Sequence, residues 1–172
     1  EVLIEVGVDS KEAKDKLAFV KSLVGKEISL KDFLKYQLLD MRGLTKGKGL
    51  VGPVKRMGIG LKAHKTEKGV RRPGTLGPWH PAHTSFRVAM AGQLGMFSRV
   101  LYNSKVVGSG TIAEKNINPA GGINQYGNIK SSYIIVKGSV QGPQKRQILM
   151  TPSFRPTKSM AKKKYEFLEV TL

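Results

Sequence analysis

The sequence predicts a mainly β protein with two helices, an α+β fold in which a small β-barrel or sandwich carries a long irregular basic extension. Two observations predict this class. Short β-branched or alternating stretches recur at close spacing in the second half, separated by Gly- and Pro-rich turns, as in small barrels and sandwiches. Residues 43–87, in contrast, show no hydrophobic periodicity and are rich in Gly, Pro and Lys. A stretch of that length in a compact domain is functional or disordered.

The first 42 residues predict a strand, two helices and a second strand. Apolar residues alternate over residues 2–8, which predicts a half-buried strand. Ser10 is a suitable N-cap and Gly25 a suitable left-handed terminator, so a helix is predicted over Lys11–Val24. A shorter helix is expected after Ser29, leading into a strand over Leu38–Arg42. The inward-facing residues of the first helix are expected to be Leu17, Val20, Leu23 and Val24.

The second half predicts short strands. Ser98–Tyr102 and Lys105–Val107 are expected to form a hairpin across Asn103 and Ser104. Tyr133–Lys137 and Gln147–Thr151 are further predicted strands, and Tyr165–Val170 is expected to be the last one.

These elements predict one domain over residues 1–172. Residues 1–42 and 88–157 are expected to form the barrel body with its helices, 43–87 the basic central extension, and 158–172 a C-terminal tail. The chain starts at Glu1 without a methionine, inside a predicted strand, so an N-terminal part is expected to be missing.

The net charge of +18 is concentrated in one tract. Arg42–Arg72 holds ten Lys or Arg and one acidic residue. Such a tract is either a solvated, soluble face or a surface for a polyanion, and like charges so close repel each other unless counter-charge is supplied. We therefore favour nucleic acid, and RNA over DNA, because no recognition helix carries the charge. No apolar run is long enough to span a membrane, so no membrane partner is expected.

Three glycines in the basic tract, Gly47, Gly49 and Gly52, match the GxGxxG pattern of dinucleotide-binding turns. That pattern must open a helix, and Pro53 follows at once, with no acidic residue about 20 positions further on. We prefer the alternative that small residues let the backbone approach a ligand closely.

Other chemistry has little support in the sequence. The chain has no cysteine, and His64, His80 and His83 lack acidic or thiolate neighbours, so we expect no metal and read these imidazoles as phosphate or ribose contacts. No carboxylate pair suggests acid–base catalysis, so no enzyme activity, cofactor or small-molecule substrate is expected.

Trp79, the one tryptophan, lies between Pro78 and His80. It fits a small satellite core with Leu76, or an aromatic side chain packed against RNA at the tip of the extension. The neighbouring Arg71 and Arg72 favour the RNA contact.

Five ordered motifs resemble the large-subunit ribosomal protein L-three family: GLTKGKGLVGPVKRMG, GTLGPWHPAH, MAGQLGM, NPAGGINQYG and VKGSVQGPQKR. The similarity covers about residues 1–157 and is closer to archaeal and eukaryotic members. The resemblance implies a translation-protein-type barrel, incomplete in this chain, and an extension that reaches toward the peptidyl transferase centre. Trp79 matches the aromatic at its tip and Gln93 a glutamine that bacterial members methylate. Glu67 stands where eukaryotic members have a methylated histidine, so that modification is not expected here.

The expected function is that of a structural constituent of the large ribosomal subunit, cytoplasmic, which binds rRNA, aids assembly and contacts neighbouring ribosomal proteins. The alternative is a stand-alone RNA chaperone or RNA-binding module. The expected RNA-binding residues are Arg42, Lys46, Lys48, Lys55, Arg56, Lys62, His64, Arg71, Arg72, Trp79, His80, His83, Arg87, Gln93, Arg99, Lys145 and Arg146.

Overall fold

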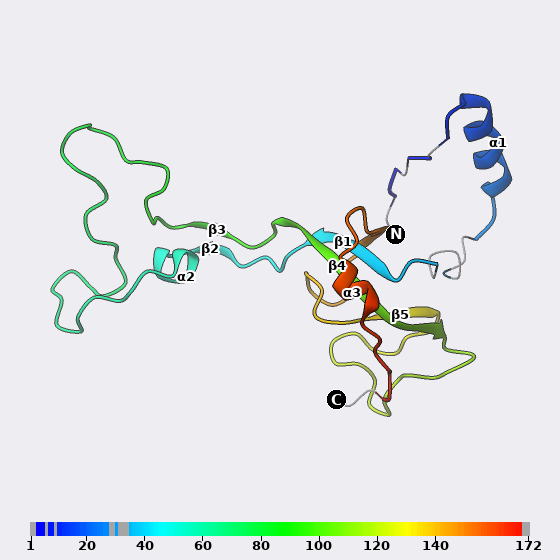
Figure 1. Cartoon of the computed structure of the whole chain (residues 1–172). Coiled ribbons are helices and arrows are strands. Elements are labelled where there is room, and N and C mark those ends of the chain that lie inside the picture. The colour runs from blue at the N-terminus through cyan, green and yellow to red at the C-terminus, as the bar shows by residue number, and fades with distance from the viewer. Residues whose placement is uncertain (1–2, 6, 9, 28–29, 31–34, 170–172) are drawn as a thin grey trace. The chain divides into compact units, whose positions relative to one another are not determined.

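A computed structural model describes residues 3–5, 7–8, 10–27, 30 and 35–169. Figure 1 labels its helices and strands, except β6. They are α1 (Ala13–Leu23), β1 (Leu38–Leu44), β2 (Gly49–Val51), α2 (Pro53–Met57), β3 (Gly92–Leu94), β4 (Ser98–Thr111), β5 (Ser132–Val136), β6 (Leu149–Pro152) and α3 (Lys158–Lys162). The chain is therefore mainly β in its regular structure, with antiparallel strand pairs and short helices.

The chain divides into two compact units. The sheet unit comprises Glu1–Gly43, Val100–Val140 and Gln144–Leu172. The basic unit comprises Leu44–Arg99 with Gln141–Pro143.

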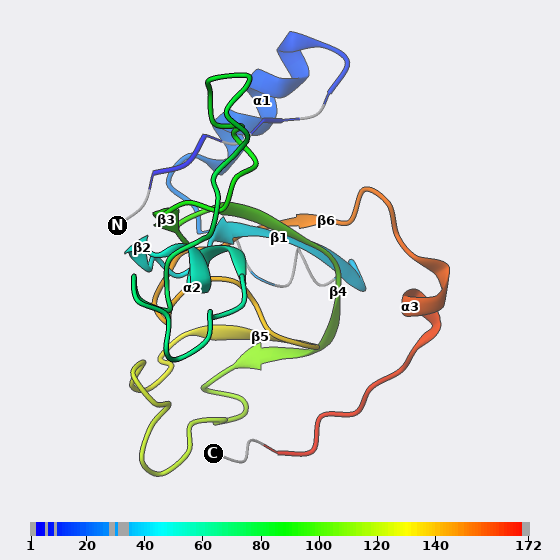
Figure 2. The ribbon, with the colours of Figure 1, turned by 90° about the vertical axis from the view of Figure 1, so that its left-hand side faces the viewer.

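The sheet unit is built on four strands in the order β5-β4-β1-β6. Figure 2 shows β1, β4 and β5 in succession. β1 pairs antiparallel with β6, with Asp40 opposite Thr151, and β4 pairs antiparallel with β5, with Gly110 opposite Tyr133. In the described part of the chain β5 and β6 are the two edges, so this sheet is open and does not close into a barrel.

The core of the sheet unit lies on β1. Leu38, Leu39 and Met41 are the buried hydrophobic residues of the described chain. Asp40, only 1% exposed, is buried among them, and its Oδ1 accepts a hydrogen bond of 2.9 Å from the backbone N–H of Asn103. This bond offsets part of the cost of burying a carboxylate.

Asn103 explains why the predicted hairpin is wrong. The residue has a left-handed φ of 57°, which asparagine tolerates well, yet the strand continues through it as β4. Its N–H faces Asp40, and its side-chain Oδ1 accepts from Ser153 Oγ (2.9 Å) and from the Thr157 N–H (3.2 Å). The turn signal at Asn103 is therefore a local distortion held by neighbouring segments.

The N-terminal predictions have mixed outcomes. α1 and β1 confirm a helix and a strand close to the predicted bounds, and Gly25, with φ 75°, follows the helix as expected. The N-cap is Glu12 and not Ser10, and none of the residues of α1 is buried, so the predicted inward face is wrong. The described residues between 3 and 8 form no strand. The second predicted helix lies mostly outside the described residues.

The predictions for the C-terminal part of the chain also have mixed outcomes. β5 and β6 confirm the strands near Tyr133–Lys137 and Gln147–Thr151. The predicted last strand is wrong for residues 165–169, which form no strand; Tyr165 contacts Lys137 and the Phe167 ring contacts Lys115. Residue 170 lies outside the described chain. Among the described residues, no helix has the length and apolar character needed to cross a bilayer.

Candidate nucleic-acid interface

The basic unit holds eleven Lys or Arg and one acidic residue, Glu67. All of its residues are described, and none of the buried hydrophobic residues of the chain lies in it. A unit without an apolar core must be ordered by backbone pairing, by specific polar contacts or by an external partner. The first two kinds of contact can be identified residue by residue.

Backbone pairing joins the two ends of the long segment. β2 and β3 run antiparallel with Leu50 opposite Gln93, although more than forty residues separate them in sequence (Figure 1). The pairing extends beyond the strands, because the Lys48 N–H donates to Leu94 O (2.9 Å) and the Met96 N–H to Lys46 O (3.3 Å). The chain between α2 and β3 is thereby closed at its base into a long loop.

Gly95 is required at this base. Its φ is 76°, and a Cβ placed on it would come 2.0 Å from the carbonyl oxygen of Lys46. No side chain fits at that distance from a backbone atom, so the close approach of the two segments depends on glycine.

Arg56 is the principal side-chain contact across the base. Its Nε donates to Gln93 O and its Nη1 to Met90 O, both at 3.1 Å. Arg56 lies in α2, and the planar fork of the guanidinium suits two carbonyls presented by neighbouring residues. Within the protein Arg56 uses Nε and Nη1 and is half-buried, so its phosphate contact stays a prediction that would involve its remaining N–H groups.

The short helix α2 also corrects an argument from the sequence. Pro53 was expected to prevent a helix, whereas it is the first residue of α2, where its missing N–H costs nothing. The GxGxxG glycines still do not form a strand-to-helix turn, because Gly47 precedes β2 and Gly49 is within it. The rejection of a dinucleotide site therefore rests on this placement and on the missing acidic residue, and not on Pro53.

Most predicted RNA-binding residues lie in the basic unit. Arg42, Lys145 and Arg146 are the exceptions and belong to the sheet unit. Arg42 lies over the ring of Phe154 at 5.6 Å, and Arg99 lies over the ring of Phe97 at 5.1 Å. Arg42, Arg56 and Lys62 are half-buried. The predicted cations that the structure leaves exposed are Lys46, Lys48, Lys55, Arg71, Arg72, Arg87, Arg99, Lys145 and Arg146.

Trp79 is 88% exposed, so it does not form the satellite core that the sequence left open. The neighbouring His80 and His83 are exposed as well, and a backbone hydrogen bond from the His83 N–H to Pro81 O (2.7 Å) tightens the chain beside them. His64 is also exposed. The described residues contain no group of three or more His, Cys, Asp or Glu arranged to hold a metal ion.

Gln93 is exposed, and its side-chain Nε2 donates to Leu94 O (3.1 Å) and to Gly95 O (3.3 Å). These bonds fold the amide back on the base of the loop. Phe86 is 92% exposed and was not among the RNA-binding residues predicted from the sequence. A simple signal was present, namely a phenylalanine between Ser85 and Arg87 in a tract with no apolar periodicity.

The sheet unit holds its C-terminal segment through lysines. Lys105 Nζ donates to Gln37 Oε1 and to Ala161 O, both at 2.9 Å, so the buried ammonium is bound to neutral acceptors. Lys137 Nζ lies 2.5 Å from Tyr165 Oη, and the hydrogen bond that it donates is the main cause of a lowered pKa of Tyr165. Desolvation opposes that shift, and the charges of Lys137, Lys163 and Lys105 add to it.

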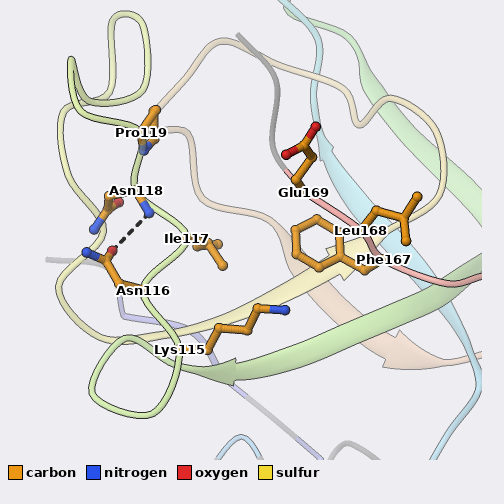
Figure 3. A pocket seen from close by; sticks show the side chains of 8 residues that line it. All are labelled: Lys115, Asn116, Ile117, Asn118, Pro119, Phe167, Leu168 and Glu169. Carbon is orange, nitrogen blue, oxygen red and sulfur yellow. Dashed lines mark hydrogen bonds between the residues drawn. The ribbon is translucent and has the colours of Figure 1, made fainter.

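A pocket of about 240 Å³ lies between residues 115–119 and 167–169 (Figure 3). Its polar side chains are mostly used within the chain. Asn118 bonds the backbone of Ile129 with both ends of its amide, and the Asn116 amide oxygen accepts from the Asn118 N–H. Lys115 lies over the ring of Phe167 at 5.1 Å. None of the predicted site residues lines this pocket.

Comparison with known proteins identifies related sequences. The family model described as Ribosomal protein L3 matches residues 1–171. Three of the similar curated proteins are each named large ribosomal subunit protein uL3. The protein from Methanococcus vannielii is 38% identical over an alignment 172 positions long, which covers 98% of this chain and 50% of that protein. The protein from Methanosphaera stadtmanae is 41% identical (89% and 47%), and that from Tetrahymena thermophila 38% identical (90% and 43%). The chain thus spans about half the length of the curated relatives it matches.

Proposed function

The chain belongs to the Ribosomal protein L3 family, and from this membership we propose that it is a structural constituent of the large ribosomal subunit. In this role it binds rRNA, aids subunit assembly and extends toward the peptidyl transferase centre. It has no catalytic activity of its own. Its partners are large-subunit rRNA and neighbouring large-subunit proteins, in the cytoplasm.

One observation carries the RNA-binding part of this proposal. The basic unit combines eleven cations and one acid with the absence of any buried hydrophobic residue. Cations at that density repel one another, and phosphates relieve this repulsion and release their own counterions on binding. Lys46, Lys48 and Lys55 are exposed near the base of the loop, and Arg71 and Arg72 are exposed further along it.

The same proposal includes the finer architecture. The four-stranded sheet is part of a translation-protein-type barrel, residues 43–87 are the basic central extension of a single domain, and residues 158–172 are its tail. The open edges of the sheet at β5 and β6 support the first statement. The base formed by β2, β3 and Arg56, from which the loop leaves, supports the second.

Co-sedimentation tests this function against the alternative of a free RNA chaperone. The tagged chain is expressed in cells, and large subunits are isolated and washed in high salt. We expect the chain to remain with the washed subunits at about one copy per particle, as expected for a component ordered between RNA segments. Recovery of the chain in the salt wash, with RNA binding intact, would favour the chaperone.

A further inference from the structure

Phe86 is more exposed than Trp79, the aromatic residue that the sequence predicts to contact RNA. Its side chain is 92% exposed, and single exposed apolar residues are common on protein surfaces. Exposure alone therefore assigns nothing to Phe86. Two further features, its backbone and its neighbouring charge, distinguish it from an ordinary exposed residue.

The backbone presents Phe86 on a tight turn. The Val88 N–H donates to Ser85 O at 3.2 Å, which closes a four-residue turn with Phe86 and Arg87 at its centre. The Ser85 hydroxyl also accepts from the Arg87 N–H at 3.4 Å, and serine is favoured at the first position of such turns. The two central side chains therefore project from a hydrogen-bonded turn and not from an unconstrained loop.

The Arg87 guanidinium lies near the Phe86 ring. The guanidinium carbon of Arg87 lies 5.7 Å from the centroid of Phe86, within the range of a cation–π contact. Because Phe86 is 92% exposed, this contact leaves most of the ring available to a further partner. Since Glu67 is the single acid of the basic unit, no carboxylate is near in sequence to neutralise Arg87.

We propose that Phe86 and Arg87 form a second stacking site for an unpaired nucleotide of RNA, separate from Trp79. The ring stacks on the base and the guanidinium neutralises the adjacent phosphate, the combination used by proteins that bind single strands. An apolar protein surface fits less well, because the exposed neighbours Thr84, Ser85 and Arg87 are polar or charged, whereas the apolar Val88 and Ala89 that follow are half-buried. This site deepens the proposed function and rests on it.

Fluorescence at position 86 tests the proposal directly. Because Trp79 is the one tryptophan, the double variant W79F/F86W carries its single indole at the turn. We expect a single-stranded oligoribonucleotide to quench this indole in proportion to binding, and a blunt RNA duplex of equal length to quench it much less. If the single strand leaves the indole fluorescence unchanged while a mobility-shift assay shows that it binds, the proposed stacking site is wrong. If the wild-type chain binds no RNA at all, the proposed function is overturned as well.

Affinity measurements with three substitutions add an independent test. F86A is expected to lower the affinity for the single strand roughly 5- to 100-fold, with the salt dependence unchanged, because stacking releases no counterions. F86W is expected to preserve the affinity and F86L to resemble F86A, since leucine is apolar but has no ring. If F86L binds like the wild type, or if F86A keeps full RNA affinity and loses a neighbouring protein from isolated subunits, the stacking site is wrong.

Discussion

Arg56 occupies the space that a side chain on Gly92 would need. A Cβ at position 92 would come 2.8 Å from the guanidinium carbon of Arg56, which is bonded to carbonyls on either side of that glycine. The absence of a side chain at Gly92 and the fork of Arg56 are therefore complementary. Together they join α2 to the segment that enters β3, in a unit without a buried apolar residue.

Replacing Arg56 by lysine should loosen the base of the loop. Lysine keeps the charge but has no planar fork, so it cannot satisfy Met90 O and Gln93 O together. Because the site is half-exposed, we expect a loss of about 1–2 kcal/mol in local stability. Hydrogen exchange at the Lys48 and Met96 amides measures it, since both donate across the base.

Two further variants show whether the fork is the cause. K55Q removes an exposed charge from the same short helix and should leave these exchange rates unchanged. G92A should displace the guanidinium and reproduce the effect of R56K, and the double variant should be no worse than either single one. Additive effects would mean that Arg56 and Gly92 act independently.

Gly95 and Gly49 provide a matched pair for the close approach of the two segments. Both have positive φ, 76° and 65°, but a Cβ at Gly95 meets Lys46 O at 2.0 Å whereas one at Gly49 meets nothing within 4 Å. G49A should cost only the left-handed backbone penalty, about 1–2 kcal/mol. G95A should in addition abolish the exchange protection of Lys48. Equal protection in the two variants would contradict the assigned contact.

The lowered pKa of Tyr165 predicts a spectroscopic signal. The difference in tyrosinate absorbance between wild-type protein and Y165F reports the ionisation of Tyr165. This difference should titrate with a pKa below the ordinary value of 10.0, because Lys137 donates a hydrogen bond to the phenolic oxygen. The corresponding difference between K137Q and K137Q/Y165F should titrate with a pKa closer to 10.0. A titration unaffected by K137Q would show that Lys137 does not cause the shift.

The same group predicts a direction for pH dependence. A pKa lowered by folding means that the ionised phenol favours the folded arrangement. The Tyr165 contribution to docking of the C-terminal segment should therefore increase as pH rises through the lowered folded pKa toward 10.0, and be lost as pH falls through that folded pKa. Protease sensitivity after residue 162, compared between wild type and Y165F over that window, measures it. Equal sensitivity throughout the window would exclude a Tyr165 contribution.

Local patterns in the sequence predicted the elements whose signals are local. The helix ending near Gly25 and the strands β1, β5 and β6 have periodic or β-branched residues within their own bounds. β2 and β3 escaped prediction because each has three residues and is stabilised by pairing across more than forty residues. α2 was recoverable, since Gly52, Pro53 and Gly58 mark its start and end.

For the candidate interface, composition predicted where the charge lies but not which charges are available. Arg56 and Lys55 are adjacent and chemically similar, yet one bonds two carbonyls across the loop base and the other is exposed. Only the long-range placement of Met90 and Gln93 distinguishes them. Phe86 and Phe97 also differ only through long-range placement. The backbone of Phe97 forms hydrogen bonds with Thr45 and its side chain is half-buried, whereas Phe86 is exposed.

Trp79 should contribute nothing to folding stability. Because its side chain is 88% exposed, W79A removes almost no buried area, and we expect an unchanged denaturant midpoint. The salt dependence of RNA binding should also stay the same. A clear loss of stability in W79A would return Trp79 to the satellite core.

The salt dependence of binding to purified large-subunit rRNA tests the central claim most directly, namely that exposed cations of the basic unit neutralise phosphates. The test variant replaces Lys46, Lys48, Lys55, Arg71 and Arg72 by glutamine. A control removes the same charge from exposed lysines of the sheet unit: Lys130, Lys158, Lys162, Lys163 and Lys164. We predict that the slope of log K against log salt becomes shallower by about 3.5–4.5 in the test variant, at roughly 0.7–0.9 per phosphate contact, and changes much less in the control. An equal change in both variants, or none in the test variant, would contradict the account.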